Sequence, residues 1–335
     1  MSVVRGPLKT EGNLILDGLG HPLTLRGVVS DWLDWQPSIA NFSPLDDSSI
    51  GRMKQWGANT VRVLLSEEFW NSNDCQFVPS YAANVDRVVE SITSRGMVAL
   101  LNLHNNARHP CQPSNQQRMA DYPGSVAFWQ SVANRYRTNP LVAFDLYNEP
   151  HDITWSQWLN GGTLVDSDGV VWQAAGMQQL YDAVRSQGAL NLVFASGNQW
   201  GNLPPPDNYL HGFNIVYAAH YYTCSSAPAT SCTTPDPYNP APPGQRLDAW
   251  TPTTKGHAVV VTEFGWPDPT SGTYNQNVIN WAESRHVGWT AYGWYTGIAG
   301  GKAAFGILND MNTFEPTPSG VPVKAGIEKG LFGLP

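Results

Sequence analysis

The sequence predicts an α/β chain folded as a single (β/α)8 (TIM) barrel, and three observations lead to this prediction. Short apolar, β-branched runs alternate with amphipathic segments, which is the pattern of βα units around a parallel sheet. Eight such runs occur, the number that closes this kind of barrel. Several are apolar on both faces, as strands between a barrel core and an outer helix layer should be. The predicted strands are 23–29, 59–65, 97–103, 141–147, 191–196, 214–220, 257–262 and 288–294.

A short segment before the first run predicts a further element. Residues 10–22 (TEGNLILDGLGHP) contain the run LILD followed by a glycine-rich turn, which indicates a hairpin. We expect this hairpin to close the bottom of the barrel. The barrel itself would then occupy about residues 23–332, within one catalytic domain spanning 1–335.

Amphipathic segments between the runs predict the outer helices. In 81–96 the apolar residues Val85, Val88, Val89 and Ile92 form one stripe at helical spacing, which Gly96 ends. Two further segments have the same pattern, whereas 197–213 leaves room for only a short helix. Those two segments are 125–136 and 174–188.

Composition narrows the classes of function. The chain has 335 residues, a formal net charge of −8, and no run of Lys and Arg, so we expect neither nucleic acid nor an anionic membrane as a partner. No stretch approaches the ~20 apolar residues of a membrane-spanning helix. Charged residues make up only 14%, and there are 14 Trp, whose faces either stack on neutral rings such as sugars or pack in the core. No glycine-rich loop follows an early strand, so the fingerprint of a dinucleotide-binding fold is missing.

The four cysteines favour disulfides over a metal site. An even number in polar stretches suggests the pairs Cys224–Cys232 and Cys75–Cys111, with free surface thiols as the alternative. No CxxC pair occurs and no His stands at ligand spacing beside a Cys, so we expect no metal and no cofactor. The start of the chain (MSVVRGPLKT) lacks the apolar segment of a signal peptide. We expect a secreted protein whose signal has been removed.

Polar residues follow six of the eight predicted strands. In a (β/α)8 barrel the chemistry lies at the carboxyl ends of the strands, so we expect these residues to converge on one face. Glu149 and Glu263 end strands that lie across the barrel from each other. Hydrolysis of a glycosidic bond needs such a pair, one carboxyl as proton donor and one carboxylate at the anomeric carbon. The strand-end residues are Arg62, His104, Asn105, Asn148, Glu149, His220, Tyr221, Tyr222, Glu263, Trp294 and Tyr295.

Other carboxylates compete with this pair. Asp31 follows the first strand and is a candidate substrate contact. Glu67 and Glu68 form a pair in a polar loop, and we expect them at the surface. Asp145 lies inside a strand, where a structural role is expected, and Glu283 lies in a predicted helix, where we expect it to be solvated.

At these positions the sequence resembles glycoside hydrolase family five, a cellulase-like family in the clan of (β/α)8 retaining glycosidases. The resemblance implies that Glu149 is the acid/base, that Glu263 is the nucleophile and that Asn148 binds the sugar 2-hydroxyl. It also implies that Arg62, His104, His220 and Tyr222 surround the two carboxylates. The matching segments are TVRVLLS at Arg62, LNLHNN at His104, FDLYNEPH at Glu149, HYY at 220–222, VVVTEFGW at Glu263 and GWYT at Trp294.

Elementary electrostatics is consistent with these roles. Arg62 and the Tyr222 hydroxyl would stabilise an ionised Glu263, and the charge of Glu263 would raise the proton affinity of Glu149. His220 is either a hydroxyl ligand or a satisfied core histidine, and Trp294 either stacks under the sugar at the cleavage point or packs in the core. Possible subsite platforms follow strands one, five and seven; they are Trp32, Trp35, Trp200 and Trp266.

We therefore expect a monomeric retaining endo-β-1,4-glucanase acting on a β-linked polysaccharide or oligosaccharide. Endo-β-mannanase is the first alternative. An exo-β-glucosidase is the second, because residues 223–250 could block one end of a cleft. A non-catalytic sugar-binding protein would not need both glutamates. A metal-dependent hydrolase would need an HxH motif at the first strand, and the sequence contains no HxH.

Overall fold

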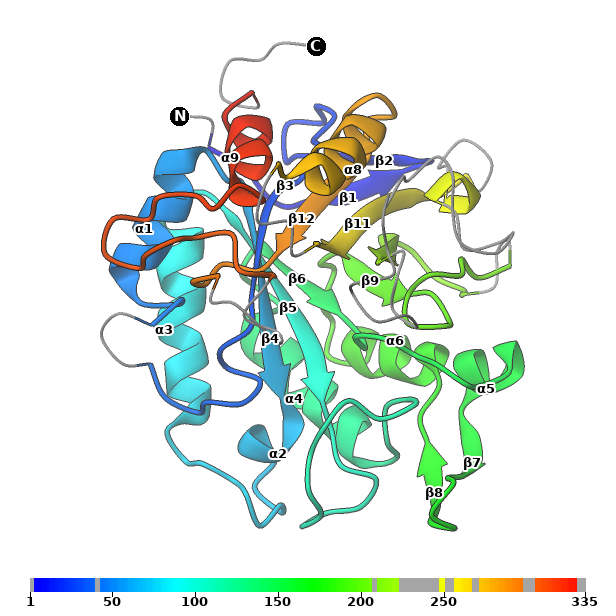
Figure 1. The fold of residues 1–335 in the computed structure, drawn as a ribbon. Helices are drawn as coiled ribbons and strands as arrows, with labels where there is room; N and C mark the ends of the chain where they lie inside the picture. Colours follow the sequence, from blue (N-terminus) through cyan, green and yellow to red (C-terminus); the bar gives the residue numbers. More distant parts are fainter. Residues whose placement is uncertain are drawn as a thin grey trace.

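A closed barrel of eight parallel strands forms the centre of the computed structural model (Figure 1). The structure describes residues 3–39, 43–206, 210–222, 247–250, 256–266, 271–297 and 305–329. Each of the eight runs predicted as a strand supplies one barrel strand, so the predicted fold is confirmed. Around the barrel the order is β10 (Ile215–Tyr221), β11 (Ala258–Phe264), β12 (Gly288–Tyr292), β3 (Arg26–Ser30), β4 (Thr60–Ser66), β5 (Val98–Asn105), β6 (Val142–Asp145) and β9 (Val193–Ser196).

Helices surround the barrel, as the amphipathic segments predict. The stripe of Val85, Val88, Val89 and Ile92 is buried against the strands. Within the described part of the chain, no helix is long and apolar enough to cross a membrane. The helices are α1 (Asp47–Trp56), α2 (Glu67–Trp70), α3 (Tyr81–Thr93), α4 (Gly124–Tyr136), α5 (Trp155–Asn160), α6 (Met177–Arg185), the 3-10 turn Leu247–Trp250, α8 (Thr273–Glu283) and α9 (Gly320–Lys329).

The predicted turn after LILD is present, with Leu16 bridged antiparallel to Pro22, and a further strand and turn precede it. Strands β1 (Lys9–Glu11) and β2 (Leu14–Leu16) pair antiparallel, and Gly12 makes the turn between them at a φ of 58°. Ile15 belongs to the buried cluster that fills the lower barrel together with Val98. The hairpin thus closes the end of the barrel where the strands begin.

A second hairpin, which we did not predict, follows β6. Strands β7 (Gly162–Val165) and β8 (Val171–Ala174) pair antiparallel and stand at the edge of the molecule beside α5 (Figure 1). Leu164 and Trp172 face each other in the register, and both are buried. The sequence signal was the turn DSDG between the apolar pairs Leu164-Val165 and Val170-Val171, which is typical of a hairpin.

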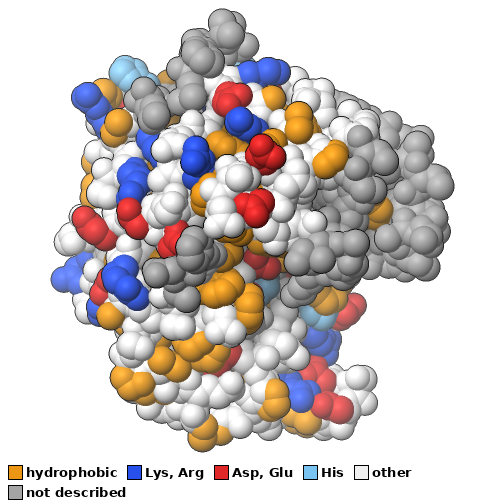
Figure 2. Space-filling view, turned by 60° about the vertical axis from the view of Figure 1, so that its left-hand side comes forward, with side chains coloured by type: hydrophobic (Ala, Val, Ile, Leu, Met, Phe, Trp, Pro, Cys, Tyr) orange, Lys and Arg blue, Asp and Glu red, His pale blue; other side chains and the backbone are white. Residues whose placement is uncertain are grey.

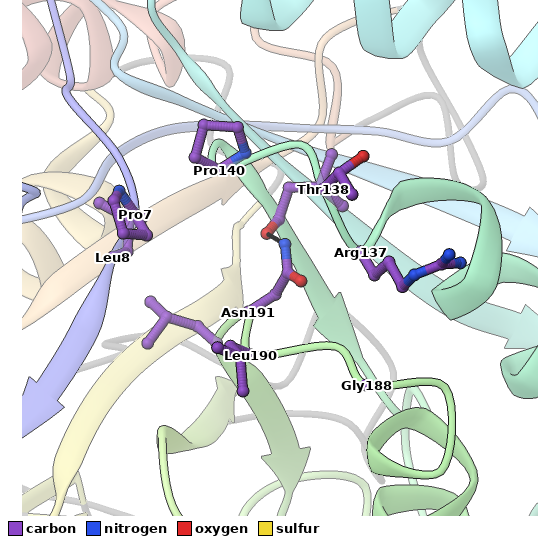
Figure 3. A pocket seen from close by; sticks show the side chains of 10 residues that line it. Pro7, Leu8, Arg137, Thr138, Pro140, Gly188, Leu190 and Asn191 are labelled. Carbon is purple, nitrogen blue, oxygen red and sulfur yellow. Dashed lines mark hydrogen bonds between the residues drawn. The ribbon is translucent and has the colours of Figure 1, made fainter.

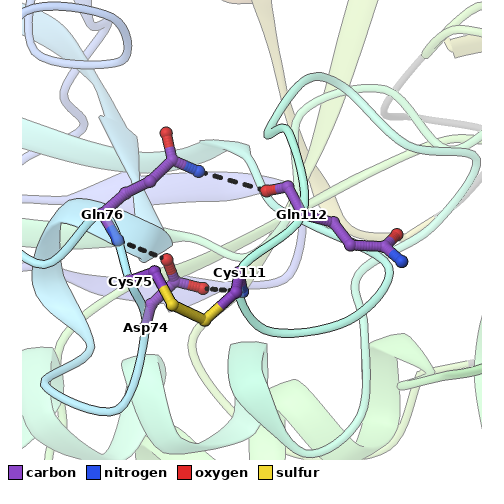
Figure 4. The surroundings of a disulfide bond; sticks show 5 residues. All are labelled: Asp74, Cys75, Gln76, Cys111 and Gln112. Carbon is purple, nitrogen blue, oxygen red and sulfur yellow. Dashed lines mark hydrogen bonds between the residues drawn. A yellow bond between two sulfur atoms is a disulfide. The ribbon is translucent and has the colours of Figure 1, made fainter.

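A disulfide joins the loop after α2 to the loop after β5 (Figure 4). The Cα atoms of Cys75 and Cys111 lie 4.8 Å apart, which confirms one of the two predicted pairs. An Asp74 carboxylate oxygen accepts a hydrogen bond from the backbone N–H of Cys111 at 2.9 Å, so the bridge is supported by polar contacts. The other predicted pair, Cys224 and Cys232, lies outside the described residues.

The surface carries both signs of charge. Figure 2 shows acidic and basic side chains interspersed over one face, with hydrophobic side chains gathered below them. Among the described residues of this face, the two signs of charge stay mixed.

Candidate active site

Arg62 lies at the centre of the barrel and holds three groups together. It is fully buried, its Nε donates to Asp145 Oδ2 at 2.9 Å, and its Nη1 donates to Glu263 Oε2 at 2.7 Å. The third donor, Nη2, binds Asn148 Oδ1 at 2.8 Å. Burial opposes the charge, but the carboxylates of Asp145 and Glu263 outweigh it and raise the pKa of Arg62. Asp145 therefore has the structural role expected from its place inside a strand.

Arg62 lies within β4, and its long side chain reaches the residues that stand at the carboxyl ends of the other strands. Asp145 is the last residue of β6, and Asn148 and Glu149 follow it directly. In β10 the register shifts between Ala219 and His220, and this irregularity pairs His220 with Glu263 on β11. The barrel thus gathers side chains from β4, β6, β10 and β11 at one point.

Glu263 accepts a hydrogen bond on each carboxyl oxygen. Tyr222 Oη donates to Oε1 at 2.8 Å, and Arg62 donates to Oε2. Burial and the nearby charge of Glu263 hold the pKa of Tyr222 well above its usual range, so the phenol remains a donor. A carboxylate that accepts at both oxygens and is fixed in orientation suits the part of a nucleophile.

Glu149 has different partners. Its Oε1 lies 2.8 Å from His220 Nδ1, and its Oε2 accepts from Gln116 Nε2 at 2.8 Å. Burial lowers the pKa of His220 to about 4; Arg62 acts in the same direction, and Glu263 and Asp145 oppose it. His220 is therefore neutral near pH 7, and a neutral partner leaves Glu149 free to exchange its proton.

Gln116 was missed by the sequence analysis. It lies in the loop between β5 and α4, away from any strand end, and it bridges the two neighbours Asn148 and Glu149. Two backbone hydrogen bonds between Asn106 and Asn115 fix the loop beside it. No sequence pattern marks such a residue, because its position depends on how the loop folds back onto the strand.

One ligand atom each from Glu149, His220 and Glu263 lie within 4.8 Å of one another. The two carboxylates are thus well inside the ~6.5–9.5 Å separation of inverting pairs and near the ~5–5.5 Å of retaining pairs. A metal ion could also be held by three such atoms. Here, however, both oxygens of each glutamate and the His220 Nδ1 already have protein hydrogen-bond partners, which explains the cluster without an ion.

The structure corrects the expectation for Trp294. Its side chain is fully buried, its Nε1 donates to Ser49 Oγ at 2.7 Å, and its ring packs edge-on against Trp56 of α1. Successive side chains of a strand point alternately to its two faces, and Tyr292, the last residue of β12, points inward. Trp294 lies two positions beyond the end of the strand, where this alternation no longer holds. Trp294 therefore lies behind the barrel wall and cannot stack under a sugar.

Tyr292 is the aromatic residue that faces the site instead. Its ring packs with Tyr222 and Val29 in a small buried cluster, and its hydroxyl donates to Asp31 Oδ2 at 2.7 Å. Burial, and then the charge of Asp31, raises the pKa of Tyr292. Asp31 thus reaches the same end of the barrel, as expected, by way of an aromatic residue that the sequence analysis did not single out.

His104 lies beside the loop after β3, and the candidate platforms lie in the loops that follow β3, β9 and β11. His104 Nε2 is 4.0 Å from Asp34 Oδ2, on the side of strand one. Trp35 and Trp200 expose 52% and 40% of their surface, one face of Trp200 stacks on His151, and the rings of Trp35 and Trp32 meet edge to face. Trp266 is half-buried, with its ring tilted on Tyr274. These four tryptophans remain predicted subsites.

Three carboxylates expected to be solvated are not. Glu67 and Glu68 are buried, and Ser125 Oγ donates to Glu67 at 2.6 Å while also binding Asp121. Glu283 is half-buried and accepts two hydrogen bonds from Arg26. Helix α2 turns the pair inward, and sequence alone could not show this because the helix has only four residues.

Two cavities are present in the described part of the molecule, one far from the glutamates and one that adjoins Glu149 through Gln116. One of about 370 Å³ opens at the amino ends of β6 and β9, among residues such as Leu8, Pro140 and Asn191 (Figure 3). It is at the opposite end of the barrel from the glutamates. A larger cavity of about 620 Å³ is lined by Gln116 and by His151, and the β7–β8 hairpin closes its far side.

Comparisons with known proteins agree with this geometry. The model of the cellulase family (glycosyl hydrolase family 5) matches residues 16–297. Endoglucanase C of Evansella cellulosilytica is 23% identical over 84% of this chain and 35% of its own length. A probable endo-beta-1,4-glucanase B of Aspergillus niger is 30% identical over 64% of this chain and 65% of its own. The chain spans about a third of the first two bacterial relatives, at 35% and 34%.

Solved structures share the fold. A beta-glucanase of Saccharophagus degradans has a TM-score of 0.73 at 18% identity, over 97% of this chain and 94% of its own. The catalytic domain of Thermobifida fusca endoglucanase Cel5A has a TM-score of 0.68 at 16% identity, over 96% and 97%. With the family model matching most of its length, the chain belongs to the cellulase family, glycosyl hydrolase family 5.

Proposed function

We propose that this chain is a retaining endo-β-1,4-glucanase. The observation that carries the proposal is the pair Glu149 and Glu263, brought within 4.8 Å at the carboxyl end of a barrel and given opposite surroundings. Glu263 is fixed by a charged guanidinium and a phenol, whereas Glu149 meets a neutral imidazole and a neutral amide. Such a difference in surroundings separates a nucleophile from an acid/base.

The reaction then has two displacements. The Glu263 carboxylate attacks the anomeric carbon, while Glu149 gives its proton to the departing glycosidic oxygen. The covalent glycosyl ester removes the charge of Glu263. Glu149, now ionised, takes a proton from water, the water oxygen bonds to the anomeric carbon, and Glu263 leaves with overall retention. Asn148, held by Arg62, is placed to bind the 2-hydroxyl of the sugar.

The substrate is proposed from the relatives and from the exposed aromatic residues. Several relatives carry the name endoglucanase, which denotes an enzyme that cleaves glucans. A structurally similar beta-glucanase was solved in complex with cellotetraose. Trp35 and Trp200 offer exposed rings for a flat, neutral glucan chain. The low content of charged residues, 14%, suits a neutral polymer better than a uronate.

The test compares carboxymethyl cellulose with galactomannan at equal mass, following viscosity and reducing ends together. We expect faster release from cellulose, with viscosity falling early. Faster release from mannan would make the chain a β-mannanase, and reducing ends that rise without loss of viscosity would make it an exo-acting enzyme. A variant lacking both glutamates, Glu149→Ala with Glu263→Ala, is the control for binding without turnover.

The remaining proposals concern the state of the protein. We propose that it is secreted, which the Cys75–Cys111 disulfide supports because such bonds persist in oxidising compartments. We also propose a monomer that needs neither metal nor cofactor. Light scattering at several protein concentrations tests the monomeric state. Activity measured after exhaustive treatment with a chelator tests whether a metal is needed.

A further inference from the structure

We propose that Gln116 is a positioning residue that keeps Oε2 of Glu149 in the acceptor state in the free enzyme and that substrate displaces it. The inference rests on the proposed function, because it takes Glu149 as the acid/base. It is carried by a chain of hydrogen bonds whose directions are all determined. The chain runs from Arg62 through Asn148 and Gln116 to Glu149.

The direction of each bond follows from its neighbour. A guanidinium has only donors, so the atom of Asn148 that meets Arg62 must be its oxygen. The Asn148 amide nitrogen then points to Gln116, which must offer its own oxygen, at 2.9 Å. The Gln116 amide nitrogen is left facing Glu149 Oε2, at 2.8 Å, and this oxygen can only accept. A permanent charge thus fixes the state of an oxygen three side chains away.

Oε2 is also the oxygen through which Glu149 meets the substrate. Oε1 faces His220, which is fully buried and leaves no open side at that oxygen. Oε2 faces Gln116, which is half-buried and lines the cavity of about 620 Å³. A glycosidic oxygen has no hydrogen to donate, so Oε2 must carry the proton when the two meet. The Gln116 N–H and the glycosidic oxygen therefore compete for one place.

Displacement of Gln116 by the substrate raises the proton affinity of Glu149 at the step in which Glu149 must carry a proton. A donor to the carboxylate favours its ionised form, so the loss of that donor raises the proton affinity of Glu149. The other titratable groups that face Glu149 include His220, Tyr222 and Glu263, and the Gln116 substitution leaves all three in place. The same movement frees the amide nitrogen of Asn148 for a sugar hydroxyl. Substrate binding is thereby coupled to protonation of the acid/base, and the adjoining cavity provides space for the displaced amide.

The test compares Gln116→Leu with Gln112→Leu, a glutamine of the same loop that lines the same cavity and whose backbone carbonyl accepts a hydrogen bond from Gln76. The pH profile of kcat/KM reports the free enzyme, and that of kcat reports the complex. We expect Gln116→Leu to move the basic limb of kcat/KM upward by about one pH unit and to leave that of kcat in place. Gln112→Leu should move neither.

Equal shifts in both profiles, or no shift in either, would overturn the inference. If Gln116→Leu does not fold, Gln116→Asn serves instead, because its shorter amide cannot span Asn148 and Glu149 and should give the same upward shift. A carbon-13 titration of the Glu149 carboxyl in the free protein needs no turnover, and a higher midpoint in the variant is expected there. Absence of β-glucan hydrolysis in the unmodified protein would refute the proposed function alone, since the carboxyl titration still tests Gln116.

Discussion

Arg62 Nη1 lies 2.7 Å from Glu263 Oε2, and both groups are buried in the barrel. The same guanidinium donates to Asp145 Oδ2 at 2.9 Å. One cation thus serves two carboxylates, one structural and one assigned to chemistry. The fold and the reaction share this charge, so a change at Arg62 affects both.

Replacement of Arg62 by Met should lower the free energy of unfolding by roughly 3–5 kcal/mol, because it leaves buried charge without a partner. Urea denaturation measures this loss. Arg135, which pairs with Asp86 at the surface, provides the control, and Arg135→Met should cost under ~1 kcal/mol. Similar losses in the two variants would contradict the central role of Arg62.

Replacement of each glutamate by Ala should give variants that differ in residual activity and in the product of azide rescue. Glu149→Ala should retain activity on aryl glycosides with good leaving groups, because these need no protonation, and azide should rescue it to a β-glycosyl azide. Glu263→Ala should lose activity on every substrate, and its azide product should have the inverted configuration. Proton NMR of the first-formed product of the unmodified protein should show the β anomer. An α anomer appearing first would refute retention.

The barrel could be predicted because its strands are apolar on both faces and its polar residues stand at strand ends. Arg62, Glu149 and Glu263 were found on that basis. Gln116 could not be found, because the loop that carries it is placed by backbone bonds between Asn106 and Asn115. Trp294 was misplaced for a related reason, since β12 ends at Tyr292 and the alternation of faces ends with it.

Glu68 should make the protein less stable as the pH rises. Burial raises the pKa of Glu68 to about 7 from an ordinary value of 4.5. Between these values the folded state binds more protons than the unfolded state, so stability falls as pH rises through this window and is level above it. Glu68→Gln is neutral throughout. Its stability relative to the unmodified protein should therefore rise by up to ~3 kcal/mol between pH 4.5 and pH 8.

Urea denaturation at several pH values measures this difference, and Glu90→Gln, at an exposed position on α3, is the matched control. The control should give a difference that hardly changes with pH. A Glu68→Gln difference that is equally flat would show that Glu68 ionises normally.

The Cys75–Cys111 disulfide should stabilise the loops beside the site. Its partners are 36 residues apart, and closing a loop of that length in the unfolded chain is worth roughly 3–4 kcal/mol. The double variant Cys75→Ser with Cys111→Ser should therefore have a free energy of unfolding lower by that amount, measured by urea denaturation. A peptide map of the oxidised protein should contain the linked pair. Recovery of both cysteines in alkylated form from the native protein would contradict the pairing.

Tyr292 and Trp294 should separate substrate binding from stability. Tyr292→Leu removes a ring beside Tyr222 and the hydrogen bond to Asp31, so kcat/KM on cello-oligosaccharides should fall about tenfold or more. Trp294→Phe opens space behind the wall and removes the bond to Ser49, so unfolding should become easier by roughly 2 kcal/mol while kcat/KM stays within about twofold. The reverse outcome, a raised KM in Trp294→Phe with unchanged stability, would place Trp294 in the cleft. Because the two side chains lie two residues apart, the pair of variants decides which of them the substrate meets.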